Sequence, residues 1–136
     1  MKVFISHSSP GTFLARSIAT GLRKEGLDVW LAENEILPGD NWALQVAQAL
    51  NGCDAMVALL TPDTLQTGNV QSEMGFAMGL KKYRQRLIPV LVGAESEMPA
   101  QSVPWILERF RVIRLADPDK ANEVVREVAE ALMAAA

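Results

Sequence analysis

One carboxylate in this chain lies where an apolar side chain would be expected. If residues from about Asn69 to Leu80 form a helix, Glu73 shares one helix face with apolar residues. They are Val70, Phe76, Ala77 and Leu80. A single preorganised carboxylate can stabilise positive charge that develops on a substrate or activate a water molecule, whereas ordinary glycosidases use a pair. A charge on this apolar face needs a reason, so Glu73 is singled out as a candidate site residue. The open alternative is a helix that is rotated or begins later, which would leave Glu73 at a solvated edge.

The composition is that of an ordinary globular domain. The chain has 136 residues, 49% of them hydrophobic and 21% charged, which predicts one domain over residues 1–136. The sequence has no apolar run of membrane-spanning length and no recognisable signal peptide, so we expect a cytoplasmic protein without membrane contact. A net charge of −3 gives no basis for direct nucleic-acid binding.

Several familiar kinds of site are disfavoured by the residues available. One cysteine and one histidine exclude an internal disulfide and a zinc site of the usual ligand set, and we expect no metal. The chain has neither a G-x-G-x-x-G motif nor a Walker loop, which disfavours a dehydrogenase or a nucleoside triphosphatase. His7 lies in a serine-rich turn, but no G-x-S-x-G elbow supports a serine hydrolase.

Strand-like segments recur along the chain. They are residues 2–6, 29–31, 54–60, 87–92 and 111–115. The segment at 54–60 is apolar without alternation, which predicts a central strand that is covered on both faces. Pro89 removes one backbone donor, so its strand should lie near the sheet edge or contain a bulge.

Amphipathic helices alternate with these strands. They are expected at residues 12–25, 41–51, about 69–80 and after Pro118. Gly26 should end the first helix and Asp40 should cap the second, in which Trp42 begins the packing face. Residues 32–40 are polar and irregular, which predicts a loop. The basic run at 81–86 is interpreted as the solvated end of the Glu73 helix.

This alternation predicts an α/β fold with a five-stranded parallel sheet and helices on both faces. In a flavodoxin-like sheet of order 2-1-3-4-5 the first and third strands are neighbours, and ligands bind at the carboxyl ends of the strands. Ser6, His7 and Ser8 would then face the beginning of the Glu73 helix across one crevice.

Four blocks of sequence are similar, in order and spacing, to the Toll/interleukin-1 receptor (TIR) domain, most closely its bacterial form. They are VFISHSSP, VWLAENEILPGDNW, CDAMVALLTPDTL and NVQSEMGFAMG. The resemblance implies that Glu73 corresponds to the catalytic glutamate of the family. It also implies that the loop from Glu33 to Asn41 mediates contacts between TIR domains.

Many members of this family cleave the nicotinamide–ribose bond of NAD+, so the resemblance implies an NAD+ hydrolase or cyclase with NAD+ as substrate and no cofactor. Positive charge develops on the ribose while nicotinamide leaves as a neutral base, so one carboxylate suffices. The candidate substrate-binding residues are Ser6, His7, Ser8, Asp40, Trp42 and Asn69. The serine-rich turn offers donors to a pyrophosphate, and Trp42 or Trp30 offers a ring for stacking on a base.

Two functions of different classes stay open. The first is an NAD+-cleaving enzyme of bacterial antiphage immunity, activated by self-assembly through the Glu33–Asn41 loop and controlled by a sensor or effector partner. The second is a non-catalytic TIR–TIR scaffold or adaptor. The presence of Glu73 favours the enzyme, because adaptors of the family often lack this residue.

Overall fold

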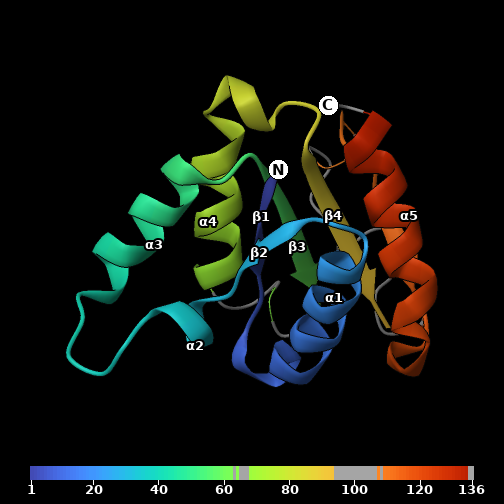
Figure 1. The fold of residues 1–136 in the computed structure, drawn as a ribbon, viewed down its shortest axis with the longest axis horizontal. Helices are drawn as coiled ribbons and strands as arrows, with labels where there is room; N and C mark the ends of the chain where they lie inside the picture. Colours follow the sequence, from blue (N-terminus) through green and yellow to red (C-terminus); the bar gives the residue numbers. More distant parts are fainter. Residues whose placement is uncertain (63, 65–67, 94–106, 108, 135–136) are drawn as a thin grey trace.

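The strands form one parallel sheet between two layers of helices (Figure 1) in the computed structural model, which describes residues 1–62, 64, 68–93, 107 and 109–134. The strands are β1 (Lys2–Ser6), β2 (Asp28–Trp30), β3 (Ala55–Leu60), β4 (Leu87–Val92) and β5 (Ile113–Leu115). Neighbouring strands are parallel and their order is β2-β1-β3-β4-β5, which confirms the predicted flavodoxin-like α/β fold. Each predicted strand segment is found, with small differences at the ends.

Helices cover both faces of the sheet. The α-helices are α1 (Thr12–Lys24), α2 (Ala32–Glu35), α3 (Trp42–Gly52), α4 (Gly68–Met78) and α5 (Ala121–Ala134). The 3-10 turns are η1 (Ser9–Gly11), η2 (Lys81–Tyr83) and η5 (Pro118–Lys120). In Figure 1, α1 and α5 lie on one side of the sheet, and α3 and α4 lie on the other.

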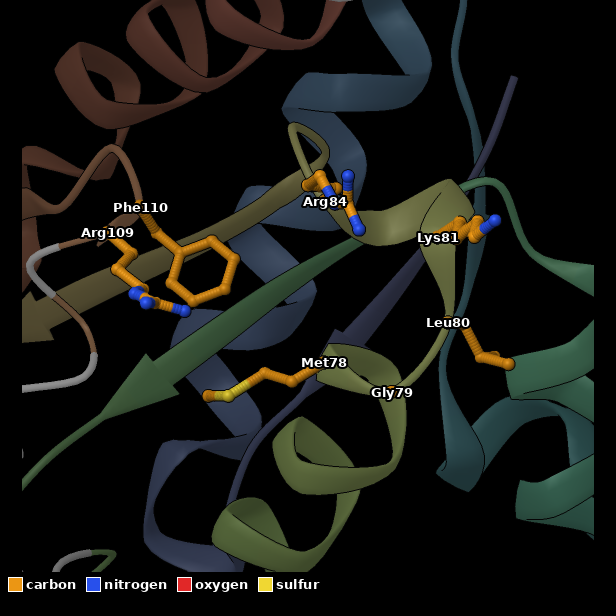
Figure 2. Close-up of a pocket in the computed structure, with 7 residues that line it drawn as sticks. All are labelled: Met78, Gly79, Leu80, Lys81, Arg84, Arg109 and Phe110. Carbon is orange, nitrogen blue, oxygen red and sulfur yellow. The ribbon is translucent and has the colours of Figure 1, made fainter.

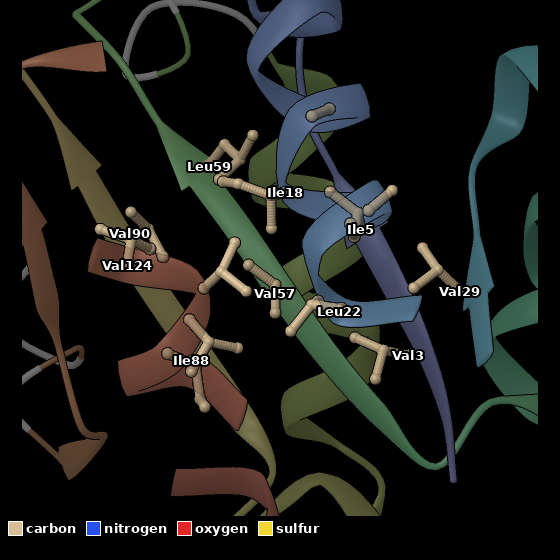
Figure 3. Packing of buried hydrophobic residues seen from close by; sticks show 14 of the residues in the cluster. Val3, Ile5, Ile18, Leu22, Val29, Val57, Leu59, Ile88, Val90 and Val124 are labelled. Atoms are coloured by element: carbon tan, nitrogen blue, oxygen red, sulfur yellow. The ribbon is translucent and has the colours of Figure 1, made fainter. Parts of the chain in front are cut away.

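Two apolar clusters hold these layers together, because alternate strand residues point to opposite faces. Val57 and Leu59 of β3 pack under α1 and α5, while Met56 and Leu60 pack under α4. Figure 3 shows the first cluster, in which Ile18 and Leu22 of α1 lie over the sheet. Every residue of β3 is buried, as predicted for a central strand.

The segment after β2 differs from the prediction. Residues Ala32–Glu35 form one turn of helix, α2, where a loop was expected. Asn41, and not Asp40, caps α3, since its side chain accepts a hydrogen bond from the Leu44 backbone N–H at 3.1 Å. The Asp40 carboxylate instead accepts from the backbone N–H of Leu37 at 2.9 Å and closes the intervening turn.

The proline strand is not an edge strand, because β4 lies between β3 and β5. The backbone carbonyl of Arg86 accepts a hydrogen bond from the Met56 N–H of β3. The backbone groups of successive residues point to opposite neighbouring strands, so Pro89, three residues later, points toward β5 and away from β3. Pairing with β5 begins only at Val90. The missing donor of Pro89 therefore falls just before the β5 ladder starts.

The basic run is also organised differently from the prediction. Helix α4 ends at Met78, and Lys81–Tyr83 form the separate turn η2. Tyr83 is fully buried, and its hydroxyl donates to the backbone carbonyl of Leu50 at 2.5 Å. The run is therefore not the end of α4. Tyr83 anchors the C-terminal end of α3, while Lys81, Lys82, Arg84 and Gln85 are exposed as expected.

Candidate active site

The Glu73 side chain lies beside the carboxyl end of β1. Val70 and Ala77, one turn before and after it on α4, are fully buried against the sheet and fix the rotation of the helix. This rotation directs the half-buried Glu73 carboxylate toward Ser6, which is 1% exposed. The Ser6 hydroxyl lies 3.4 Å from Oε1 and 3.3 Å from Oε2 of Glu73 and donates to the carboxylate. Glu73 is therefore not at a solvated edge.

The environment makes this carboxyl group a weaker acid than usual. Burial raises the pKa of Glu73 to about 7, while the Ser6 hydrogen bond and the charge of His7 act in the opposite direction. Burial is the largest of these effects because removal from water penalises the charged form. At neutral pH the group is poised between its two forms, which suits a residue that exchanges a proton or stabilises a cation.

A mainly apolar groove opens in front of Glu73. Its volume is about 310 Å³, and it is lined by residues of α3 and α4 that include Trp42, Val46, Ser72, Glu73 and Phe76. The Trp42 side chain is 53% exposed and that of Phe76 is 43% exposed. The periodicity of the sequence placed both on packing faces, and this prediction is wrong because both are exposed large hydrophobic residues. The exposed rings instead form the walls of the groove.

His7 lies next to this site and is held by α2. Its Nε2 is 3.1 Å from Oε2 of Glu33, and its Nδ1 is 2.8 Å from the Ser8 carbonyl oxygen. The other oxygen of Glu33 lies 3.8 Å from Nε of Arg16. The one-turn helix α2 thus brings a carboxylate to the rim of the candidate site.

The remaining candidates are placed differently. Asp40 is exposed, and its carboxylate is engaged within the turn before α3. Asn69 lies in the first turn of α4, but its side chain is outside the described residues. Trp30 is 7% exposed and stacks on Phe4 with ring centroids 4.8 Å apart, so this ring belongs to the core. Of the two tryptophans among the described residues, Trp42 is the one whose ring is accessible beside Glu73.

Other ionisable groups do not add to the site. Burial raises the pKa of the Cys53 thiol to about 11, which keeps it protonated and unreactive at neutral pH. Within the described residues, no three His, Cys, Asp or Glu side chains are grouped so that they could hold a metal ion. The described helices include none that could cross a membrane.

Two features of the site could not be read from the sequence. The contact between His7 and Glu33 depends on α2, which is too short to show a helical period. Phe76 and Ser72 line the groove only because α3 stands away from the sheet and leaves that side of α4 open. No pattern in the sequence marks these features, because the exposure of apolar residues on both helices is seen only in the structure.

Comparison with known proteins gives a family by sequence and similar folds by structure. The family model described as "TIR domain" matches residues 3–128. No curated protein sequence matches the chain. The fold is similar to that of a metazoan TIR-STING receptor from C. gigas, solved in complex with 2′,3′-cGAMP, with a TM-score of 0.79 and 24% identity. That match covers 96% of this chain and 38% of the receptor, so the chain spans less than half of the receptor's length.

Two further structures match over nearly their whole length. The TIR domain of the Toll-related receptor TRR-2 from Hydra magnipapillata has a TM-score of 0.73 at 15% identity, covering 96% of this chain and 97% of that domain. The CMP N-glycosidase BcmB of Clostridium botulinum has a TM-score of 0.68 at 13% identity, covering 93% of this chain and 98% of the enzyme. At such identities these matches show a shared fold.

Proposed function

Since the chain belongs to the TIR domain family, we propose that it cleaves the nicotinamide–ribose bond of NAD+ with Glu73 as the catalytic carboxylate. The observation that carries this proposal is the position of Glu73, which accepts from Ser6 at the carboxyl end of β1 and lines an apolar groove. Ligands of doubly wound sheets bind at this edge. The name of the structurally similar CMP N-glycosidase also denotes cleavage of an N-glycosidic bond in a nucleotide.

The chemistry requires one carboxylate. As the bond between ribose C1′ and the pyridinium nitrogen breaks, its electron pair neutralises the nitrogen and C1′ becomes an oxocarbenium ion. The ionised Glu73 stabilises that cation, and after water adds to C1′ the surplus proton passes to the carboxylate. The products are nicotinamide and ADP-ribose, or a cyclic isomer where an adenine nitrogen replaces the water.

Residues around Glu73 supply the binding interactions. The accessible ring of Trp42 offers a stacking surface for a base at the mouth of the groove. His7 and the turn Ser6–Ser8 lie at the rim, where donors suit the pyrophosphate. Binding of the cationic pyridinium favours the ionised form of Glu73, so the substrate itself prepares the catalytic group.

The alternative is a scaffold without turnover that assembles through its Glu33–Asn41 loop. One observation favours an interface there, namely that Leu37 in this loop is 65% exposed. Assembly is compatible with the enzyme as well, as the means of activation. The expected setting in bacterial antiphage immunity and control by a sensor or effector partner stay predictions.

Incubation of the purified chain with NAD+ tests the proposal. Nicotinamide release is measured by chromatography over a wide range of protein concentration, with and without a crowding agent. We expect Glu73→Gln to lower the rate by about 100-fold or more, which is the size of effect seen when a preorganised electrostatic contact is lost. Glu130→Gln changes an exposed glutamate of α5 and serves as the matched control.

Two results would contradict the proposal. Equal nicotinamide release by the parent protein and Glu73→Gln would remove Glu73 from the mechanism. No release at any concentration, combined with concentration-dependent assembly, would favour the scaffold.

A further inference from the structure

A second cavity, separate from the Glu73 groove, lies at the C-terminal end of α4. Its volume is about 500 Å³. Met78 and Leu80 border it on one side, Arg84 follows η2, and Arg109 and Phe110 precede β5 (Figure 2). None of its lining residues belongs to the Glu73 groove. The proposed reaction therefore leaves this cavity without a role.

The cavity gathers positive charge that the described structure does not neutralise. Arg84 and Arg109 both line the cavity and come from different segments of the chain, whereas Figure 2 shows the ammonium group of Lys81 pointing away from them. Neither arginine forms an ion pair within the described part of the chain. Two like charges that face one hollow repel each other, and this arrangement occurs in a chain whose net charge is −3. An anion bound between the two arginines would remove the repulsion.

The type of cation narrows the choice of anion. A guanidinium group is a planar fork of donors that matches the oxygens of a phosphate, and the two forks in this cavity come from different segments of the chain. A phosphate between them would accept hydrogen bonds from both.

Apart from Lys81, the rest of the lining carries no charge and is mainly apolar. The ring of Phe110 and the side chain of Met78 lie beside the hollow (Figure 2). An aromatic face and a thioether both make favourable contacts with a flat ring. The volume also falls in the range of pockets that hold small ligands, about 300–1,000 Å³. A ligand that joins a phosphate to a planar ring satisfies both parts of the cavity.

We propose that this cavity is a binding site for a nucleoside phosphate, with the phosphate between Arg84 and Arg109 and the base against Phe110 and Met78. The site is distinct from the NAD+ groove and does not depend on turnover there. It assigns a role to Arg84 of the basic run at 81–86, in which Lys82 and Tyr83 already contact the end of α3. An acidic peptide segment is the less favoured occupant, because carboxylates alone would leave the Phe110 face unused.

Calorimetric titration of the full chain with 5′-AMP tests this proposal. We expect saturable binding that Arg84→Gln and Arg109→Gln each weaken by about tenfold or more, as for a lost charge-assisted hydrogen bond. Both arginines are exposed, so the variants should fold, which circular dichroism checks. Arg126→Gln, on exposed α5 surface, is the control and should leave the affinity unchanged.

Further probes separate the possible ligands. Adenosine and inorganic phosphate should each bind more weakly than 5′-AMP, because each satisfies only half of the cavity. The proposal is overturned if 5′-AMP does not bind, if the arginine variants bind it as tightly as the parent, or if phosphate alone binds equally well. Binding of a peptide with the sequence of residues 33–41 in place of 5′-AMP would identify a protein partner and would also overturn it.

Discussion

Glu33 and His7 form a contact that has a consequence for the charge of the site. Nε2 of His7 lies 3.1 Å from a Glu33 carboxylate oxygen, while Nδ1 lies 2.8 Å from the Ser8 carbonyl oxygen. A carbonyl and an ionised carboxylate can only accept, and a neutral imidazole has only one N–H to donate. Both contacts are hydrogen bonds only if His7 is a protonated imidazolium or Glu33 itself carries a proton. The geometry thus favours an extra proton beside Glu73.

A substitution at Glu33 should change this charge without removing the side chain. In Glu33→Gln the amide can donate to Nε2, so a neutral His7 keeps both contacts. We expect the KM for NAD+ to rise several-fold, because a cation near the pyrophosphate is lost. We also expect the pH midpoint of kcat/KM to rise, since the charge of His7 lowers the pKa of Glu73.

Glu35→Gln is the matched control for this variant, because Glu35 is an exposed residue of the same helical turn. Steady-state kinetics between pH 5.5 and 8.5 provide both readouts, as about seven evenly spaced points suffice to locate a midpoint within this range. An unchanged KM together with an unchanged midpoint would show that Glu33 has only a structural role.

The pH dependence of NAD+ cleavage should report the ionisation of Glu73. The reaction needs the carboxylate, whose pKa is raised to about 7, so kcat/KM should increase as the pH rises through about 7. The midpoint for kcat should lie lower, because the bound pyridinium cation favours ionisation. Ser6→Ala removes a hydrogen bond to the charged form and should move the kcat/KM midpoint upward. A flat profile for the parent protein would contradict the assignment.

Replacing Glu73 should stabilise the fold at neutral and alkaline pH. The folded-state pKa of about 7 lies above the ordinary value of 4.5 for a glutamate, so the folded protein binds more protons than the unfolded chain between these values. Its free energy of unfolding therefore falls as the pH rises from about 4.5 to 7. Glu73→Gln removes this dependence. The free energy of unfolding of the variant should therefore exceed that of the parent protein by an amount that grows over this interval to at most about 3 kcal/mol.

Urea denaturation at pH 4.5, 6 and 8 measures this effect; the expected difference is smallest at about pH 4.5 and largest at about pH 8. The same change should lower the rate of NAD+ cleavage by about 100-fold or more, so stability and activity would move in opposite directions. A variant that is equally destabilised at every pH would show that the Gln side chain disrupts packing.

The exposed ring of Trp42 should contribute to substrate binding and little to stability. Its side chain is 53% exposed and borders the groove that contains Glu73. Stacking on a base is worth about 1–3 kcal/mol, so Trp42→Ala should raise the KM for NAD+ by about 5-fold to 150-fold. Phe13→Ala removes an 83% exposed ring of α1 outside the groove and should leave the kinetics unchanged. Equal KM values for the two variants would exclude stacking on Trp42.

Tyr83 should be a stability residue with no role in catalysis. Its buried hydroxyl donates to the Leu50 carbonyl at 2.5 Å and lies 3.3 Å from the backbone carbonyl oxygen of Cys53. Tyr83→Phe keeps the ring but leaves buried carbonyl groups without this donor, which should cost about 1–3 kcal/mol of unfolding free energy. Chemical denaturation measures the loss, and the kcat of the folded variant should stay near that of the parent. A change below about 0.5 kcal/mol would mean that water replaces the hydroxyl.

The position of Glu73 could be predicted because two periodic patterns agree there. Helical spacing buries Val70 and Ala77, and the strand order brings the end of β1 to the same edge of the sheet. Those patterns are set by burial of apolar side chains, which the sequence records directly. The Ser6–Glu73 contact then follows from the topology.

The rim of the site could not be predicted, because its residues are not arranged by burial. Helix α2 buries no side chain, so no pattern marks it, and the approach of Glu33 to His7 results from the path of the backbone after β2. Trp42 and Phe76 have the spacing of core residues but remain exposed, since the space that would bury them is left open between α3 and α4.

Because α2 is short, contacts made by Leu37 can affect the Glu33–His7 pair. Glu33 lies one helical turn from the exposed segment that contains Leu37. A neighbouring molecule that binds Leu37 would therefore also affect the position of the Glu33 carboxylate. If docking strengthens the Glu33–His7 contact, reciprocity requires that a stronger Glu33–His7 contact favours docking to the same extent. Self-association and the arrangement beside Glu73 would then be coupled through α2.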